Sequence, residues 1–289
     1  MAGLLFSLGM DMVVTRNVAA VNNMVIGQMD VHHFPDGETL IRIMSDVSGK
    51  DVALLCTLNH PDEKTVSLMF FADTVRDLGA KSVRLIAPYL GYMRQDKRFH
   101  EGEAVTSDIY AAFLSRYFDG LITVDPHLHR HTALSDIYTI PTRVVHAAEP
   151  IAAWILANVE NPVLIGPDEE SAQWVSDIAQ RIKAPSTVQI KIRLGDEDVK
   201  MTIPRLDEYR AMTPVLMDDI ISTATTMVVA VNHIRQQTSV APVCIGVHPI
   251  FAGDAYQCLV AAVGTGKIVT CNTIHHPTNE IDISHLLVL

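Results

Sequence analysis

The segment PVLMDDIISTATTMVVAVNHI, residues 214–234, predicts a buried strand that leads through a polar turn into a helix. Its apolar run ends in Asp218 and Asp219, and the helical pattern opens at about Thr223. In open α/β sheets, ligands bind beyond the carboxyl ends of the strands, where such turns lie. The segment therefore predicts an α/β fold and, within it, a ligand site.

The residue types of this turn suit a sugar phosphate. Backbone N–H groups at a helix N-terminus bind phosphate, and carboxylates accept hydrogen bonds from sugar hydroxyls. The side-chain hydroxyls available in the turn belong to Ser222, Thr223, Thr225 and Thr226. The alternative, from the residues alone, is an acidic strand end followed by a threonine that caps an ordinary helix.

Strand and helix patterns alternate along the rest of the chain. Apolar, β-branched runs predict further strands at residues 51–58, 82–89, 120–126, 162–167, 242–248 and 267–273. A helix is predicted after Pro61, with acidic residues in its first turn and a stop at Gly79. This alternation implies mainly parallel sheets, flanked by helices, with right-handed crossovers.

The length of 289 residues predicts two domains. The junction with the fewest long apolar runs lies around residues 126–150, and we place the boundary near residue 146. The expected domains are residues 1–146 and 147–289. They could be two similar open sheets, although no sequence repeat between them is strong.

The composition limits the classes of partner. A hydrophobic content of 48% excludes intrinsic disorder. With 22 Lys and Arg against 33 Asp and Glu, the net charge of −11 repels an extended polyanion, so we expect no nucleic acid partner. A small anionic substrate would need a local cluster of cations or a metal ion.

The location is also predicted from the sequence. The first residues, MAGLLFSLGMDMVV, lack a positive region and meet Asp11 early, which makes a poor signal peptide. No apolar run reaches membrane-spanning length, so we expect no membrane partner and a cytoplasmic protein. Three of the four cysteines lie in apolar runs and are expected in the core.

Five further segments carry residues suited to anionic ligands. They are FPDGE (34–38), APYLGYMRQDKR (87–98), TVDPH (123–127), GPD (166–168) and KIR (191–193). Taken singly, these segments also fit ordinary turns, a solvated basic loop or an exposed strand edge. Arg94, Lys97 and Arg98 nevertheless follow a strand, where they would reverse the negative field of the surface.

The alternating histidines His127, His129 and His131 raise the possibility of a zinc site on one face of a strand. No cysteine or further histidine at readable spacing completes a closed site. We therefore expect His129 and His131 at the surface.

Together, the six segments resemble the ribose-phosphate diphosphokinase family, which has the type I phosphoribosyltransferase fold. Residues 214–226 are similar to its phosphoribosyl-diphosphate loop, and the other five segments match its motifs in the same order. The resemblance implies two tandem phosphoribosyltransferase-like domains, with ATP bound by the first and ribose 5-phosphate by the second. It also implies transfer of the β,γ-diphosphoryl group of ATP to the C1 hydroxyl of ribose 5-phosphate.

The resemblance assigns roles to individual residues. The expected ATP contacts are Phe34, Asp36, Gly37, Glu38, Arg94, Gln95 and Asp96. The expected ribose 5-phosphate contacts are Asp218, Asp219, Ser222, Thr223, Ala224, Thr225 and Thr226. His127 and Asp168 would hold Mg²⁺, and Lys191 and Arg193 would stabilise the transferring group. In the family, the FPDGE element reaches the ATP site of a neighbouring subunit, which implies a homo-oligomer.

One departure from the family pattern affects the phosphate loop. Ala224 and Thr225 stand where the family has two glycines, and glycine permits positive φ. A β-branched threonine at positive φ would be costly. Either the loop keeps negative φ, or the ribose-phosphate site is weakened.

Two other functions remain open. A non-catalytic paralogue that regulates an active synthase would keep the fold but lose charged residues of the site, whereas Lys191, Arg193, His127 and Asp168 are retained. A nucleobase phosphoribosyltransferase would share the Asp-Asp loop but needs one domain and no ATP motifs.

Overall fold

The chain folds into two compact units. The computed structural model describes residues 2–128, 130–167, 171–188, 190–193, 199–202 and 206–289. Unit 1 comprises Met1–His146 together with Ser284–Leu289, and unit 2 comprises Ala147–Ile283. The expected second domain, residues 147–289, therefore differs from unit 2 at its end, because the last six residues belong to unit 1.

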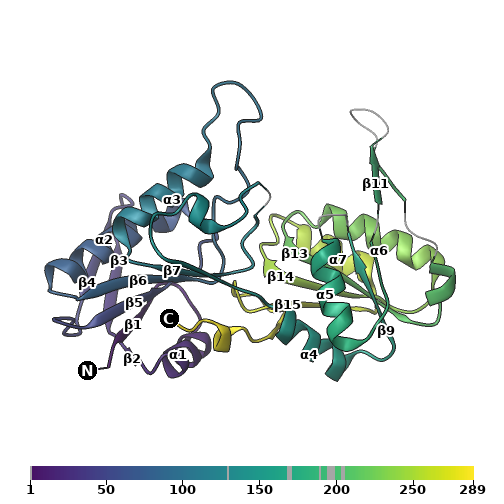
Figure 1. Ribbon diagram of the computed structural model, residues 1–289, viewed down its shortest axis with the longest axis horizontal. Helices are drawn as coiled ribbons and strands as arrows, with labels where there is room; N and C mark the ends of the chain where they lie inside the picture. Colours follow the sequence, from purple (N-terminus) through teal and green to yellow (C-terminus); the bar gives the residue numbers. More distant parts are fainter. Residues whose placement is uncertain (1, 129, 168–170, 189, 194–198, 203–205) are drawn as a thin grey trace. The chain divides into compact units, whose positions relative to one another are not determined.

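Unit 1 contains a six-stranded parallel sheet in the order β2-β1-β5-β6-β7-β8. The helices α2 and α3 cover one face of this sheet and α1 lies on the other (Figure 1). A separate antiparallel hairpin, β3–β4, is inserted between β2 and β5. The bounds are β1 (Leu4–Ser7), α1 (Met12–Val21), β2 (Val25–Ile26), β3 (Met29–His33), β4 (Thr39–Ile43), β5 (Asp51–Leu55), α2 (Asp62–Asp77), β6 (Ser82–Ala87), α3 (Thr106–Tyr117), β7 (Leu121–Val124) and β8 (Thr142–Val145).

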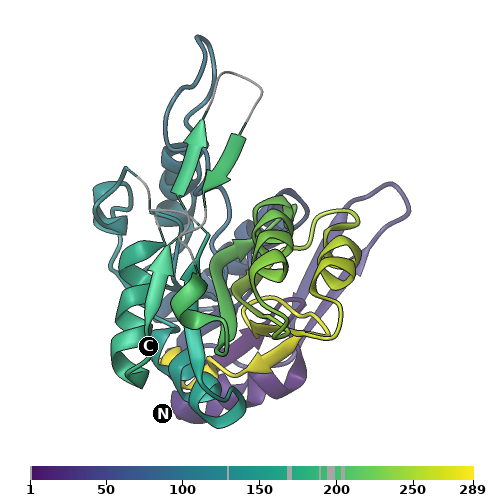
Figure 2. The same ribbon diagram turned by 90° about the vertical axis from the view of Figure 1, so that its right-hand side faces the viewer.

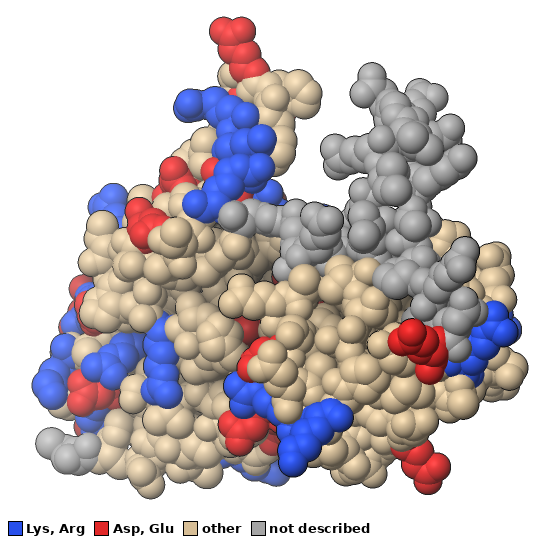
Figure 3. Space-filling model, turned by 45° about the vertical axis from the view of Figure 1, so that its right-hand side comes forward, with Lys and Arg blue, Asp and Glu red and all other residues tan. Residues whose placement is uncertain are grey.

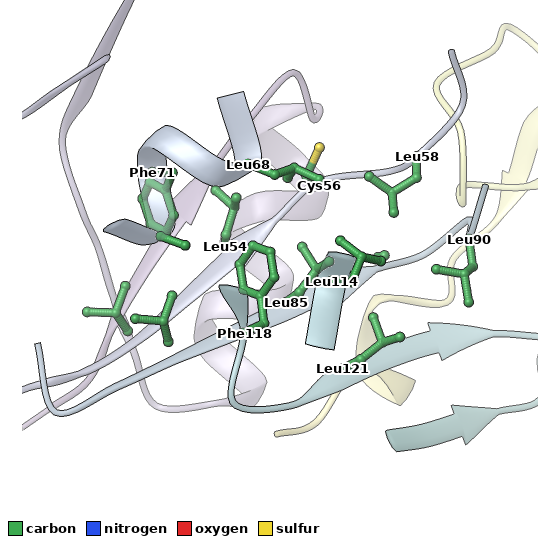
Figure 4. Packing of buried hydrophobic residues seen from close by; sticks show 14 of the residues in the cluster. Leu54, Cys56, Leu58, Leu68, Phe71, Leu85, Leu90, Leu114, Phe118 and Leu121 are labelled. Atoms are coloured by element: carbon green, nitrogen blue, oxygen red, sulfur yellow. The ribbon is translucent and has the colours of Figure 1, made fainter. Parts of the chain in front are cut away.

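The core of unit 1 lies between the sheet and the pair α2–α3. Leu54 and Leu85 of the central strands face Leu68 and Phe71 of α2 and Leu114 of α3 (Figure 4). These side chains are fully buried, and burial of each contributes about 1.5–3 kcal/mol. The same cluster extends to Leu58 and Leu90, which lie beyond the carboxyl ends of β5 and β6.

Unit 2 contains a second six-stranded parallel sheet, in the order β10-β9-β13-β14-β15-β16. The helices α6 and α7 cover one face, and α4 and α5 cover the other (Figure 2). The antiparallel hairpin β11–β12 stands away from this sheet. The bounds are α4 (Ala148–Asn158), β9 (Pro162–Gly166), α5 (Ala172–Ile182), β10 (Ser186–Val188), β11 (Ile190–Arg193), β12 (Val199–Thr202), β13 (Thr213–Ile221), α6 (Thr225–Gln237), β14 (Val243–Pro249), α7 (Ala255–Val263), β15 (Lys267–Cys271) and β16 (Asn279–Ile281).

The two sheets have the same topology. In each unit, the second strand lies at the edge beside the first, and the other four follow in chain order on the other side. Each unit also carries its antiparallel hairpin between the second and third strands of the sheet. The similar open sheets suggested by the sequence are thus present, and the equivalence allows loops to be compared one by one.

The predicted fold class is confirmed in both units. All seven predicted strands are present. The predicted helix after Pro61 is α2, which ends at Asp77, two residues before the predicted stop at Gly79. Cys56, Cys244 and Cys271 are buried, as expected, while Cys258 is exposed. Among the described residues, no helix combines the length and apolarity needed to cross a bilayer.

The last residues of the chain are fixed to unit 1 by specific contacts. The Asn22 side chain donates to the Leu287 carbonyl at 2.8 Å and accepts from the Leu289 amide at 2.6 Å. Arg143 donates to the Val288 carbonyl at 2.7 Å. These contacts explain why the tail groups with the first unit.

The tail should contribute to the stability of the chain. Leu287 is fully buried, so we expect Leu287→Ala to lower the free energy of unfolding by about 2–5 kcal/mol. The control is Leu156→Ala on α4, where the side chain is 64% exposed and the loss should stay within about 0.5 kcal/mol. Urea unfolding of both variants makes the comparison, and equal losses would contradict the packing described for the tail.

Candidate active site

Arg94, Gln95, Asp96 and His127 lie in loops at one edge of the six-stranded sheet of unit 1, whereas the FPDGE residues lie on the separate β3–β4 hairpin. Because β5, β6, β7 and β8 are parallel, the loops that follow them all leave from their carboxyl ends. The loop after β6 contains Arg94, Gln95 and Asp96, and the loop after β7 contains His127. Short hydrogen bonds join neighbouring loops, including Leu58 N–H to the Tyr89 carbonyl at 2.9 Å.

The loop between β6 and α3 projects beyond the sheet and carries three cationic residues, Arg94, Lys97 and Arg98. Figure 3 shows Lys and Arg side chains gathered along it, with acidic side chains at its tip. Lys97 Nζ lies 4.9 Å from the centre of the Phe99 ring. Asp96, Glu101 and Glu103 balance these three cations in number, so the positive charge is confined to the side of the loop that the cations occupy.

Two carboxylates organise the projecting loop from within. Asp96 is buried, with its side chain only 3% exposed, and it accepts a hydrogen bond from Arg130 at 2.7 Å. Glu103 accepts from His100 Nδ1 at 2.7 Å, from the Phe99 amide at 2.8 Å and from Gln95 Nε2 at 3.1 Å. Hydrogen bonds from His100 and Phe99 lower the pKa of Glu103, because they stabilise its ionised carboxylate.

Glu103 and Arg130 were not predicted from the sequence. An acidic residue that follows a run of cations by a few positions was the available signal for Glu103. The carboxylate of Asp96 is buried in the loop and paired with Arg130, and the ATP contact expected for this residue stays a prediction.

The FPDGE segment forms the turn of the β3–β4 hairpin. The Phe34 amide donates to the Glu38 carbonyl at 2.8 Å, and the Gly37 amide donates to the Phe34 carbonyl at 2.9 Å. Gly37 has a φ of 93°, a conformation that favours glycine, and Asp36 accepts from the Glu38 amide at 3.2 Å. All five residues are exposed, and Phe34 exposes 40% of its surface.

His127 is half-buried just beyond β7, beside a hydrogen-bonded pair. The carboxylate of Asp125 lies 2.7 Å from His146 Nδ1, which joins the ends of β7 and β8. His129 and Asp168 lie outside the described residues. His131, expected at the surface, is partly exposed at 17%, and its Nε2 lies 3.7 Å from Asp108 Oδ1.

Lys191 and Arg193 lie on β11 of the antiparallel hairpin in unit 2. The backbone is extended as predicted, and these residues pair with Met201 and Val199 of β12. The hairpin occupies the same topological position in unit 2 as the FPDGE hairpin does in unit 1.

The predicted phosphate loop follows β13 of unit 2. Asp218 and Asp219 are half-buried within β13, which continues two residues beyond the predicted strand end, to Ile221. Two backbone hydrogen bonds hold the loop, from Phe251 N–H to the Ile221 carbonyl at 2.9 Å and from Ala252 N–H to the Ser222 carbonyl at 3.0 Å. The helix opens at Thr225, later than the predicted start at about Thr223.

The conformation of Ala224 explains the later helix start and excludes the alternative of a helix capped by a threonine. It occupies the N-cap position with a φ of 57° and a ψ of 4°, which is the left-handed conformation. Alanine has no side chain that could cap the first N–H groups of α6, so this is not a threonine-capped helix. The positive φ falls on Ala224, and the more costly β-branched Thr225 is the first helical residue.

Comparisons with known proteins cover both units. A family model described as the N-terminal domain of ribose phosphate pyrophosphokinase matches residues 4–117. A second, described as a phosphoribosyl transferase domain, matches residues 134–261. Ribose-phosphate pyrophosphokinase of Methanobrevibacter smithii is 30% identical with 89% of each chain covered, and that of Sulfolobus acidocaldarius is 32% identical with 86% of each covered.

A solved structure matches the whole fold. The phosphoribosylpyrophosphate synthetase of Mycobacterium smegmatis superimposes with a TM-score of 0.83, covering 97% of this chain and 91% of the other. Its sequence identity is 21%, so this likeness concerns the fold. The type I phosphoribosyltransferase-like architecture expected for both domains agrees with these matches.

The left-handed conformation of Ala224 gives a stability test with a matched control. A β-branched side chain is strained at positive φ and would also crowd a buried position. We expect Ala224→Val to lower the free energy of unfolding by at least about 1 kcal/mol. We expect Thr225→Val, on the exposed first residue of α6, to change it by less than about 0.5 kcal/mol. A larger loss of unfolding free energy in Thr225→Val than in Ala224→Val would contradict the assignment of the positive φ to Ala224.

Proposed function

Because the chain belongs to the ribose-phosphate pyrophosphokinase family, we propose that it transfers the β,γ-diphosphoryl group of ATP to the C1 hydroxyl of ribose 5-phosphate. The products are phosphoribosyl diphosphate, a precursor in nucleotide biosynthesis, and AMP. The chain is thus an enzyme, a transferase built on the phosphoribosyltransferase fold.

One observation carries the assignment of the two substrates. The strand-end loop of unit 1 presents cations, whereas the strand-end loop of unit 2 presents two carboxylates and a helix start whose cap residue is alanine. The first set suits the triphosphate of a nucleotide, and the second suits a sugar that carries a phosphate.

Ribose 5-phosphate binds in unit 2. The phosphate is held by the N–H groups at the start of α6 and by the hydroxyls of the loop, from Ser222 to Thr226. Asp218 and Asp219 accept hydrogen bonds from the ribose hydroxyls. Ala224 permits this geometry in the absence of glycine, since its small side chain tolerates the left-handed conformation better than threonine would.

ATP binds through unit 1. Arg94 and Gln95 contact the nucleotide from the projecting loop, while Asp96 and Glu103 hold that loop in place. Phe34, Asp36, Gly37 and Glu38 form a second, exposed element that contacts ATP bound to a neighbouring subunit. An exposed aromatic ring at a hairpin turn has no role in the core of its own unit, which supports a role between subunits.

Mg²⁺ is the metal that membership of the family implies for His127 and Asp168. Among the described residues, no three His, Cys, Asp or Glu side chains converge as a closed metal site. Mg²⁺ does not need one, because it takes one or two protein ligands and completes its shell with phosphates and water. His127 and Asp168 would hold the ion, which would neutralise the charge of the ATP phosphates.

The transfer is an in-line displacement. The C1 hydroxyl oxygen forms a bond to the β phosphorus as the bond from that phosphorus to the bridging α-phosphate oxygen breaks. AMP leaves with the bridging oxygen, and the hydroxyl proton passes to water. Catalysis of such reactions consists mainly of positioning and charge stabilisation. Lys191 and Arg193, two residues apart on β11, supply cations to the transferring group.

The working protein is a cytoplasmic homo-oligomer. Besides Phe34, the β3–β4 hairpin and the residue after it expose Leu40 and Met44, at 43% and 52%. Exposed apolar side chains grouped on one element mark an interaction surface. A second copy of the chain would cover this hairpin and receive its FPDGE turn.

The activity is tested by incubating the purified protein with ribose 5-phosphate and Mg-ATP. Formation of AMP and phosphoribosyl diphosphate supports the proposal. A folded protein that forms no AMP alone, but alters an active synthase when mixed with it, is the regulatory paralogue. A protein that releases diphosphate from phosphoribosyl diphosphate only when a nucleobase is added is a phosphoribosyltransferase.

The role of Lys191 is tested by Lys191→Ala. Removal of a cation that contacts the transferring group should lower kcat by at least about 100-fold, with little change in thermal stability. The control is Lys267→Ala, an exposed residue of unit 2 paired with Glu280, which should keep the turnover of the unchanged protein. An unaltered kcat in Lys191→Ala would remove this residue from the mechanism.

The shared ATP site is tested by mixing two inactive variants. We expect Asp36→Ala and Lys191→Ala to be nearly inactive separately. After the subunits are exchanged, some sites receive an intact FPDGE turn from one chain and an intact Lys191 from the other, so activity should return. Mass measurement must confirm that mixed oligomers have formed. No recovery in mixed oligomers would show that each chain completes its own site.

A further inference from the structure

Lys64 holds the loop that precedes its own helix. It is the third residue of α2, and its ammonium group donates to the Thr57 carbonyl at 2.8 Å, the Asn59 carbonyl at 2.7 Å and Asn59 Oδ1 at 2.6 Å. An ammonium group has three N–H donors, so the three acceptors match its capacity. The contacts close the segment between β5 and α2 around one cation.

This position is unfavourable for a lysine in other respects. The first turn of a helix favours negative charge, as Asp62 and Glu63 illustrate, and disfavours a cation. Lys64 is also half-buried, and loss of water around its ammonium group lowers its pKa. A lysine at this position therefore does not stabilise the helix. Its contribution is the three hydrogen bonds that it donates to oxygens of the loop.

The loop held by Lys64 supports the segment that leads to Arg94. Leu58 N–H donates to the Tyr89 carbonyl at 2.9 Å. A Cβ atom on Gly91 would lie 2.6 Å from the Leu58 carbonyl oxygen, so the two backbones meet without room for a side chain. The Tyr92 hydroxyl donates to Asp62, and Tyr92 itself has a left-handed φ of 62°. These contacts fix the backbone two residues before Arg94.

The equivalent position in unit 2 differs. By topology, β13 and α6 correspond to β5 and α2. In both units a left-handed residue lies just before the helix: His60 is two residues before the start of α2, and Ala224 directly precedes α6. The third residue of α6 is Met227, which is buried in the core. The internal cation is thus a feature of the unit with the Arg94 loop.

We infer that Lys64 is a positioning residue for the nucleotide, which fixes the Thr57–Asn59 loop as the support from which Arg94 and Gln95 reach ATP. It contacts neither substrate. Loss of its ammonium group would release the loop, and the Gly91–Tyr92 segment would lose its fixed neighbour. This inference rests on the proposed binding of ATP by unit 1.

The test separates the two substrates. In Lys64→Met, which keeps the length of the side chain and removes its charge, we expect the KM for ATP to rise by about tenfold or more. The KM for ribose 5-phosphate should stay within about twofold, since its loop lies in unit 2. Lys64→Arg keeps a donor cation and should recover part of the ATP affinity. Calorimetric binding of a non-hydrolysable ATP analogue should weaken in parallel.

The control is Lys81→Met, an exposed lysine of unit 1 paired with Asp51, which should match the unchanged protein in both KM values. If Lys64→Met does not fold, Gly91→Ala is the second variant. Its added methyl group would displace the Leu58 backbone from the Gly91 backbone, and it should raise the KM for ATP in the same selective way. An unaltered KM for ATP in a folded variant overturns the inference, as does an equal rise of both KM values. If the unchanged protein forms no AMP, the proposed function itself fails.

Discussion

Every pair of neighbouring strands in the two six-stranded sheets is parallel, and this constraint determines where the chemistry can lie. Each crossover returns the chain to the amino end of the next strand, so the loops that follow the strands collect at one edge. In unit 1 this edge brings together the Arg94 loop, His127 and the Asp125–His146 pair, which are distant in sequence. In unit 2 it carries Asp218, Asp219 and the start of α6.

The two units have the same topology but carry different charges at equivalent positions. The loop after the third strand of the sheet contains a left-handed residue close to the helix in both units, His60 before Pro61 in unit 1 and Ala224 in unit 2. In unit 1 its carbonyl groups surround the ammonium group of Lys64, whereas in unit 2 the helix opens with threonines beside two carboxylates. A loop that already encloses a cation is suited to support a neighbour, and one that presents helix N–H groups is suited to bind an anion. The equivalent hairpins differ likewise, with FPDGE in one and Lys191 and Arg193 in the other.

The sequence predicts the central strands well, because their apolar runs are buried on both faces by helices. It misses β1, which lies inside the sheet of unit 1, and the edge strands β2, β8, β10 and β16, because each has only two to four residues and shows no period. It identifies loops but not their internal contacts, because the pairs Asp96–Arg130 and Asp125–His146 join residues that only the fold brings together. The conformation of Ala224 is likewise set by its neighbours, since alanine has no local preference for positive φ. Like Glu103, Lys64 left a signal in the sequence, in its case a cation in the first turn of a helix.

The central claim is that ATP binds through unit 1 and ribose 5-phosphate binds in unit 2. Hydrogen exchange of the intact protein, measured with each substrate separately, tests it most directly. Ribose 5-phosphate alone should protect the amides from Ser222 to Met227 at the start of α6, where the structure has an alanine cap. A non-hydrolysable ATP analogue with Mg²⁺ should protect the loop from Arg94 to Glu103 and leave the start of α6 unchanged. Protection of the Thr57–Asn59 loop by ribose 5-phosphate, with none at α6, would contradict the account.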